Sequence, residues 1–151
     1  MNWKIVLLGG LAMYVAQFVV AMAFTGPVIH EGVLEAPYDE TTEFWRPELT
    51  SEPPDMAALM PMWIASGIIG ALVIAGLYSW LRPAFSGSWW QKGIGFGVAL
   101  TLFVAVYHLS LSGVFNLPGE IWFWWTVDML IMAVVGSVAL AFVAQKVAPE
   151  S

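Results

Sequence analysis

The chain has 151 residues, of which 60% are hydrophobic and only 11% are charged, and its mean hydropathy is +0.78. Ordinary soluble domains are about 45 to 50% apolar and about a quarter charged, so this composition excludes a single water-soluble core and predicts an integral membrane protein. The net charge is −6, but eight of the eleven acidic residues fall between Glu31 and Asp55, and the sequence has no cluster of Lys and Arg that would neutralise nucleic-acid phosphates.

Four apolar runs are long enough to cross a bilayer, and they predict an all-α four-helix transmembrane bundle in one domain, residues 1–151. The predicted spans cover about residues 5–24, 57–81, 93–115 and 121–145.

The first run follows Lys4 and is expected to end at the breaker Thr25-Gly26-Pro27. A secretory signal is the alternative, because Ala21-Met22-Ala23 matches an A-x-A cleavage pattern. The run from Ile5 to Phe24 is longer than a signal core, and it matches the roughly 20 residues that span hydrocarbon, which favours a transmembrane helix.

Residues 25–56 form a proline-rich connection with eight acidic residues and one basic residue, Arg46. The connection lacks the apolar periodicity of a long helix. Its polar backbone must stay in water or be packed in protein, because hydrocarbon offers no hydrogen-bond partners. We therefore expect a long acidic outer loop between the first and second helices, anchored by Tyr38, Phe44 and Trp45.

Small residues recur at a spacing of four in the second and third predicted spans. Such stripes let membrane helices approach closely, so we expect them to pack against other helices. The stripes are Ser66 with Gly70 and Ala71 with Ala75 in the second span, and Gly93, Gly97, Thr101 and Ala105 in the third.

The basic residues predict the orientation of the bundle, because Lys and Arg accumulate on the cytoplasmic side. With four spans, Arg46 stands alone on one side. We therefore expect both termini in the cytoplasm and residues 25–56 outside. The basic residues on the other side are Lys4, Arg82, Lys92 and Lys146, and the tryptophans expected at the two interfaces are Trp3, Trp63, Trp80, Trp89, Trp90 and Trp122.

This layout resembles small four-span bacterial integral membrane proteins of uncharacterised function. The similarity rests on an Asn-Trp start, a long outer loop with aromatics and prolines, the entry Lys92-Gly93-Ile94-Gly95-Phe96-Gly97 and a tryptophan-rich fourth span. It covers most of the chain and carries no catalytic motif. The resemblance implies a location in the bacterial cytoplasmic (inner) membrane.

Four polar side chains are expected at similar depth in the outer half of the bundle. His108 and Asp128 each lie ten residues from Pro118, which brings the imidazole and the carboxylate to one level on neighbouring helices. Gln17 reaches the same level and Ser66 lies slightly deeper. An ionisable group in a span is a functional candidate, so this layer predicts a ligand-binding or proton-handling site in which Asp128 orients His108. The alternative is an interhelical hydrogen-bond cluster that fixes helix order.

Metal and cofactor sites lack a clear ligand pattern, and no cofactor is predicted. A bis-histidine haem would have to use His30, expected in the loop, and His108, expected in the third span. Met56, Met60 and Met62 cluster at the start of the second span, where thioethers could select Cu(I). Methionines at a helix start are more often packing residues.

Enzyme chemistry has no visible site, because the chain has no cysteine and contains no recognised hydrolase motif. The leading prediction is a non-enzymatic membrane protein, an accessory or structural subunit or a self-associating bundle, whose partners are the lipid bilayer, other membrane subunits or itself. The alternative is a small transporter or ligand-binding protein that uses the polar layer. A haem or copper redox protein is the third hypothesis.

Overall fold

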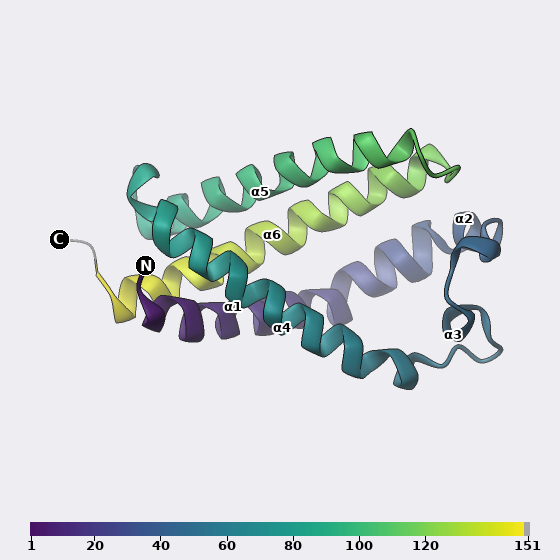
Figure 1. Cartoon of the computed structure of the whole chain (residues 1–151), viewed down its shortest axis with the longest axis horizontal. Helices are drawn as coiled ribbons and strands as arrows, with labels where there is room; N and C mark the ends of the chain where they lie inside the picture. Colours follow the sequence, from purple (N-terminus) through teal and green to yellow (C-terminus); the bar gives the residue numbers. More distant parts are fainter. Residues whose placement is uncertain (150–151) are drawn as a thin grey trace.

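A computed structural model describes residues 1–149, and residues 150–151, the end of the predicted single domain, lie outside the described part. The chain is 84% helical, and no strand occurs among the residues described. Four helices in this part are long and apolar enough to cross a membrane, which confirms the predicted all-α class (Figure 1).

The first long helix runs from Ile5 to Val33, and its two ends are wound as π-helices. Three more long helices follow it. The parts of the first long helix are η1 (Ile5–Gly9), α1 (Gly10–Val20) and η2 (Ala21–Val33). The later helices are α4 (Met56–Leu81), extended by the 3-10 turn η4 (Arg82–Ala84), α5 (Trp89–Ser112) and α6 (Gly119–Val147).

The first long helix does not end at Thr25-Gly26-Pro27, contrary to the expectation from the sequence. Pro27 removes one N–H and would interrupt an α-helical ladder, but η2 is wound in the wider i→i+5 turn of a π-helix. A Cβ on Gly26 would lie 2.6 Å from the carbonyl oxygen of Ala21, five residues earlier, so glycine is required for this turn. As a result, His30 lies on the first long helix rather than in a loop.

The predicted small-residue stripe of α5 packs against α6, and the two helices run side by side in Figure 1. A Cβ on Gly97 would lie 2.7 Å from Val134 Cα, and a Cβ on Gly93 would lie 2.9 Å from the Ser137 carbonyl oxygen. Thr101 is buried one turn further along. The expectation of close packing along this stripe is confirmed.

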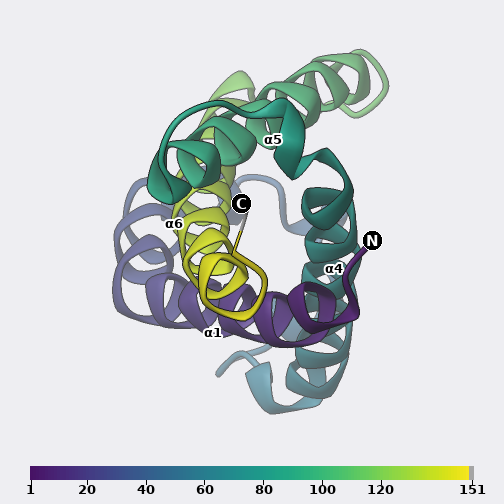
Figure 2. The same cartoon turned by 90° about the vertical axis from the view of Figure 1, so that its left-hand side faces the viewer.

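α4 packs mainly on the first long helix and diverges from α5 and α6 toward the end opposite the termini (Figures 1 and 2). Ala71 and Ala75, in the second half of its predicted stripe, are buried in the core. Near the end of α4, Tyr78 contacts Phe96 of α5 with ring centroids 5.1 Å apart. The first half of the stripe is uncovered, since Gly70 has open space around it.

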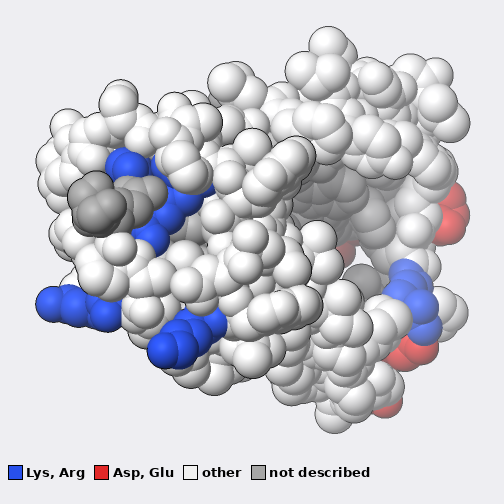
Figure 3. All heavy atoms as spheres, turned by 60° about the vertical axis from the view of Figure 1, so that its left-hand side comes forward, with Lys and Arg blue, Asp and Glu red and all other residues white. Residues whose placement is uncertain are grey.

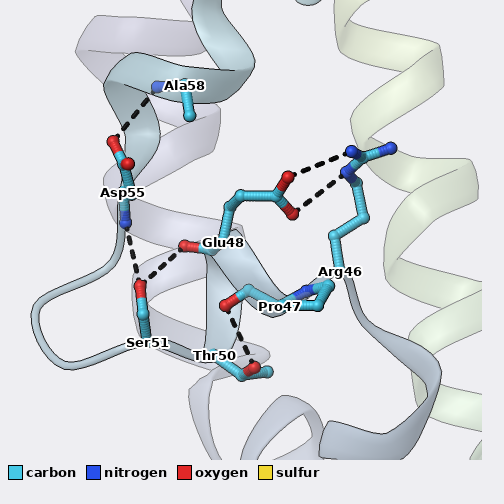
Figure 4. Close-up of polar contacts among 7 residues, drawn as sticks. All are labelled: Arg46, Pro47, Glu48, Thr50, Ser51, Asp55 and Ala58. Carbon is cyan, nitrogen blue, oxygen red and sulfur yellow. Dashed lines mark hydrogen bonds and ion pairs between the residues drawn. The ribbon is translucent and has the colours of Figure 1, made fainter.

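Residues 34–55, here called the connecting segment, join the first long helix to α4. Arg46 pairs with Glu48 at 3.1 Å, and this hydrogen bond lowers the pKa of the Glu48 carboxyl. Asp55 accepts a hydrogen bond from the Ala58 N–H at 3.1 Å and so caps α4 (Figure 4). The segment contains the short helices α2 (Glu35–Asp39), η3 (Thr42–Phe44) and α3 (Pro47–Thr50).

Charged side chains separate toward the two ends of the molecule. Figure 3 shows most of the Lys and Arg gathered at the end that holds the termini, and Asp and Glu toward the opposite end, where the connecting segment lies with its one basic residue, Arg46. Each of the four long helices brings one cation to the terminal end. These cations are Lys4, Arg82, Lys92 and Lys146.

Candidate functional site

A cluster of four polar and aromatic side chains joins three parts of the fold, and we call it the His30 cluster. His30 comes from η2, Tyr38 from α2, and Trp125 and Asp128 from α6. Trp125 and Asp128 are three residues apart, so they share one face of their helix. The position of His30 depends on the continuation of the first long helix past Pro27.

The members of the His30 cluster form a chain of polar contacts. Trp125 Nε1 donates a hydrogen bond to Tyr38 Oη at 2.7 Å, and Tyr38 Oη lies 2.9 Å from His30 Nδ1. His30 Nε2 lies 3.5 Å from Asp128 Oδ2. Trp45 supports Tyr38 by donating to its carbonyl oxygen at 3.0 Å and by an edge-on ring contact.

When His30 is neutral, only one assignment of hydrogen-bond donors and acceptors satisfies all the contacts of the cluster. An indole N–H can only donate, so Tyr38 Oη accepts from Trp125. The Tyr38 hydroxyl then donates to His30 Nδ1, which leaves the Nε2–H to donate toward Asp128. Burial raises the pKa of the Tyr38 phenol, and the charge of Asp128 raises it further against the lowering by Trp125. Tyr38 therefore keeps its proton at neutral pH.

Asp128 is only partly satisfied in this arrangement. Its Oδ1 is buried and has no hydrogen-bond partner among the residues described, while Oδ2 has only the long contact to His30. A buried polar atom without a partner is costly. The carboxylate is therefore the member of the cluster with spare capacity to accept a hydrogen bond or hold a cation.

The structure does not bring His108 and Asp128 together as the sequence suggested. His108 Nδ1 instead lies 3.0 Å from Thr126 Oγ1, and Asp128 faces His30. The His108 ring also packs beside Trp125, with ring centroids 6.2 Å apart. The side chains of His108 and Asp128 therefore have different partners, Thr126 and His30.

The other two members of the predicted polar layer lie apart from this cluster. Gln17 donates to the Met132 carbonyl at 3.3 Å, at the packing contact between α1 and α6. Ser66 is exposed and donates to the Trp63 carbonyl of its own helix at 3.2 Å. The role of all four residues in ligand or proton handling stays a prediction, and the geometry now favours Asp128 among them.

Sequence reasoning missed Tyr38 and Trp125 as polar partners and placed His30 only as a distant haem ligand. The one sequence signal was the aromatic content of residues 38–45, which was interpreted as an interfacial anchor. Among the residues described, no group of three or more His, Cys, Asp or Glu is placed to hold a metal ion. The copper hypothesis at Met56, Met60 and Met62 and the haem hypothesis stay untested.

Comparison with protein-family models, with curated proteins and with solved structures found no match for this chain.

Proposed function

We propose that this chain is a non-enzymatic integral membrane protein, an accessory subunit or a self-associating bundle, that binds another membrane helix along α4. The proposal places it in the bacterial inner membrane, as the resemblance in layout implies. Its four long helices have the length and apolarity to span a bilayer.

One observation carries the proposed association: α4 is the least covered of the four long helices. Only 11% of its most apolar stretch is buried inside the molecule, against 33% for α6. In a membrane, the part of α4 that its own chain does not cover contacts either lipid or another helix. The low coverage of α4 supports a partner on this helix.

The uncovered part of α4 also has a shape that suits a helix. A shallow, wide-open depression, here called the groove, lies along its first half; all of its lining residues belong to α4, and its surface is almost wholly apolar. Ala57 and Ala65 keep part of this surface low, and small residues allow close helix approach in membranes. The residues that line the groove are Ala57, Met60, Pro61, Ile64, Ala65 and Ile68.

The separation of charge supports a defined orientation. The terminal end holds four of the five basic residues, and the connecting segment holds seven carboxylates, at 35, 39, 40, 43, 48, 52 and 55. Basic residues favour the cytoplasmic side. We therefore propose that both termini are cytoplasmic and that the connecting segment is the outer loop.

The association is tested by placing a photo-activatable residue at Ala65, in the groove, or at Val73, an exposed α4 position outside it. In native membranes, we expect irradiation to give a discrete heavier protein product from position 65 and little from position 73. A product of twice the mass would identify a second copy, and another mass would identify a partner subunit. Equal yields of protein product from both positions, or none from position 65, would contradict the proposal.

The alternative, a transporter or ligand-binding protein that uses Gln17, Ser66, His108 and Asp128, receives less support from the geometry. Ser66 bonds to a carbonyl of its own helix, and Gln17 bonds to the Met132 carbonyl, four residues along α6 from Asp128, so both donors are engaged by backbone rather than by a titratable side chain. Asp128 is still a candidate ligand-binding residue, because its Oδ1 is buried without a partner in the described part of the chain.

A further inference from the structure

We infer that His30 and Asp128 form a proton-binding site, and that uptake of a proton there fastens the connecting segment onto α6. The inference is independent of any association through α4. It rests on the two contacts of His30, one to a carboxylate on α6 and one to a phenol on α2.

The distance between the two titratable groups leaves room for tightening. His30 Nε2 and Asp128 Oδ2 are 3.5 Å apart, which is long for an N–H···O hydrogen bond. A bond between an imidazolium and a carboxylate is shorter, about 2.7 to 2.9 Å, and roughly twice as strong as a neutral one. Protonation of His30 therefore draws η2 toward α6.

His30 is the residue of this cluster that binds the proton. An imidazole is the side chain whose charge ordinarily changes between about pH 5 and 8. Of the other groups that face His30, Asp128 supplies the counter-charge from α6, and Tyr38 from α2 keeps its proton because burial raises its pKa. Glu31 follows His30 on the first long helix and is exposed, and His108 of α5 lies across the Trp125 ring.

The contact to Tyr38 transmits the change to the connecting segment. In the neutral form, the Tyr38 hydroxyl donates to His30 Nδ1, whereas in the protonated form Nδ1–H donates to Tyr38 Oη. Tyr38 Oη then accepts from both His30 and Trp125, and its own O–H no longer donates to His30. The number of contacts is unchanged, but the bond from the imidazolium is charge-assisted and therefore stronger, which holds α2 more firmly against η2 and α6. The side-chain exposures of 37% for His30 and 23% for Asp128 show that the protein does not enclose either group completely.

The backbone of α2 offers a direct measurement. The amides of Leu34, Tyr38 and Thr41 donate to the carbonyls of Ile29, Leu34 and Tyr38, so their exchange with solvent reports opening of this region. For the full chain in zwitterionic nanodiscs, we expect these amides to exchange about fivefold more slowly at about pH 5.5 than at about pH 7.5, after correction for the intrinsic rate.

Three variants assign the effect. His30→Gln and Asp128→Asn should each make the corrected exchange independent of pH, whereas His108→Gln, whose imidazole bonds to Thr126, should keep the wild-type dependence. Equal corrected rates at the two pH values in the wild-type protein would overturn the inference, and this result does not depend on the folding of any variant. Dependence on pH that survives in His30→Gln, or that is lost in His108→Gln, would overturn it as well.

Discussion

Replacing Gly97 with alanine is expected to destabilise the bundle by about 1 to 3 kcal/mol, and replacing it with leucine by more. The added Cβ would lie 2.7 Å from Val134 Cα and 2.8 Å from the Ala133 carbonyl oxygen. Both are backbone atoms of α6, so they cannot turn away as a flexible side chain would. To make room for the Cβ, α5 and α6 must move apart along the interface between them, and they lose apolar packing there.

Gly70→Ala is the matched control for Gly97→Ala. Gly70 is also a helical glycine in a long apolar helix, but a Cβ there would meet no atom within 4 Å. Alanine is favoured over glycine within helices, so this variant should be neutral or more stable by up to about 1 kcal/mol. Unfolding of both variants by SDS in the same mixed micelles measures the difference. Equal loss of stability in the two variants would show that the α5–α6 contact is not as close as described.

Replacing Arg82 with methionine is expected to cost about 2 kcal/mol and to loosen the end of α6. The guanidinium is buried and donates to the carbonyls of Ala144 and Ala148, at 3.4 and 2.6 Å, and to Gln145 Oε1 at 3.1 Å. A fixed positive charge at this position also complements the negative end of the α6 dipole. Methionine preserves much of the apolar stem but leaves these acceptors without their donor.

Lys146→Met is the control for Arg82→Met, because it removes another cation from the same end. Lys146 is exposed and lies 5.6 Å from the centroid of the Phe142 ring. Exposed substitutions of this kind usually change stability by less than about 0.5 kcal/mol. Thermal unfolding of the two variants, with amide exchange of the last turn of α6, separates a specific role of Arg82 from a general effect of charge. A similar loss of stability in both variants would contradict a specific role of Arg82 in holding the end of α6.

The arrangement of the helices follows from features that a sequence expresses directly. Apolar length predicted four long helices, and small residues at a spacing of four predicted that Gly93 and Gly97 would face a neighbour. The stripe on α4 shows the limit of this reasoning. Ala71 and Ala75 are buried, whereas Ser66, with equal spacing, is exposed and a Cβ on Gly70 would meet no atom within 4 Å. The divergence of α4 depends on tertiary packing, which the spacing of small residues does not express.

The polar partners were harder to predict, because hydrogen bonds depend on the rotation of each helix as well as on depth. His108 and Asp128 were expected at one level, but a difference in direction gives them different partners, Thr126 and His30. The position of His30 depends on the π-helical winding through Pro27, which proline alone argues against. Because the first helix is expected from the sequence to end before Pro27, His30 is assigned to a loop, and its contact with Asp128 is not predicted.

The proposed function and the proton site meet in the connecting segment. This segment begins at the end of the first long helix and leads into α4, whose groove is the proposed binding surface. Tyr38 and Trp45 hold its first part beside α6, and Asp55 caps the start of α4. The segment is therefore the covalent link between the His30 cluster and the uncovered helix.

The central claim, that four helices cross the membrane with both termini inside, is tested most directly by labelling single cysteines. The chain has no cysteine, so Glu43→Cys in the connecting segment and Ser86→Cys in the turn before α5 give one thiol each. In intact cells with a permeabilised outer membrane, a membrane-impermeant maleimide should label Glu43→Cys, and should label Ser86→Cys only after the inner membrane is opened. Labelling of Ser86→Cys from outside, or equal labelling of both variants in intact cells, would contradict the account.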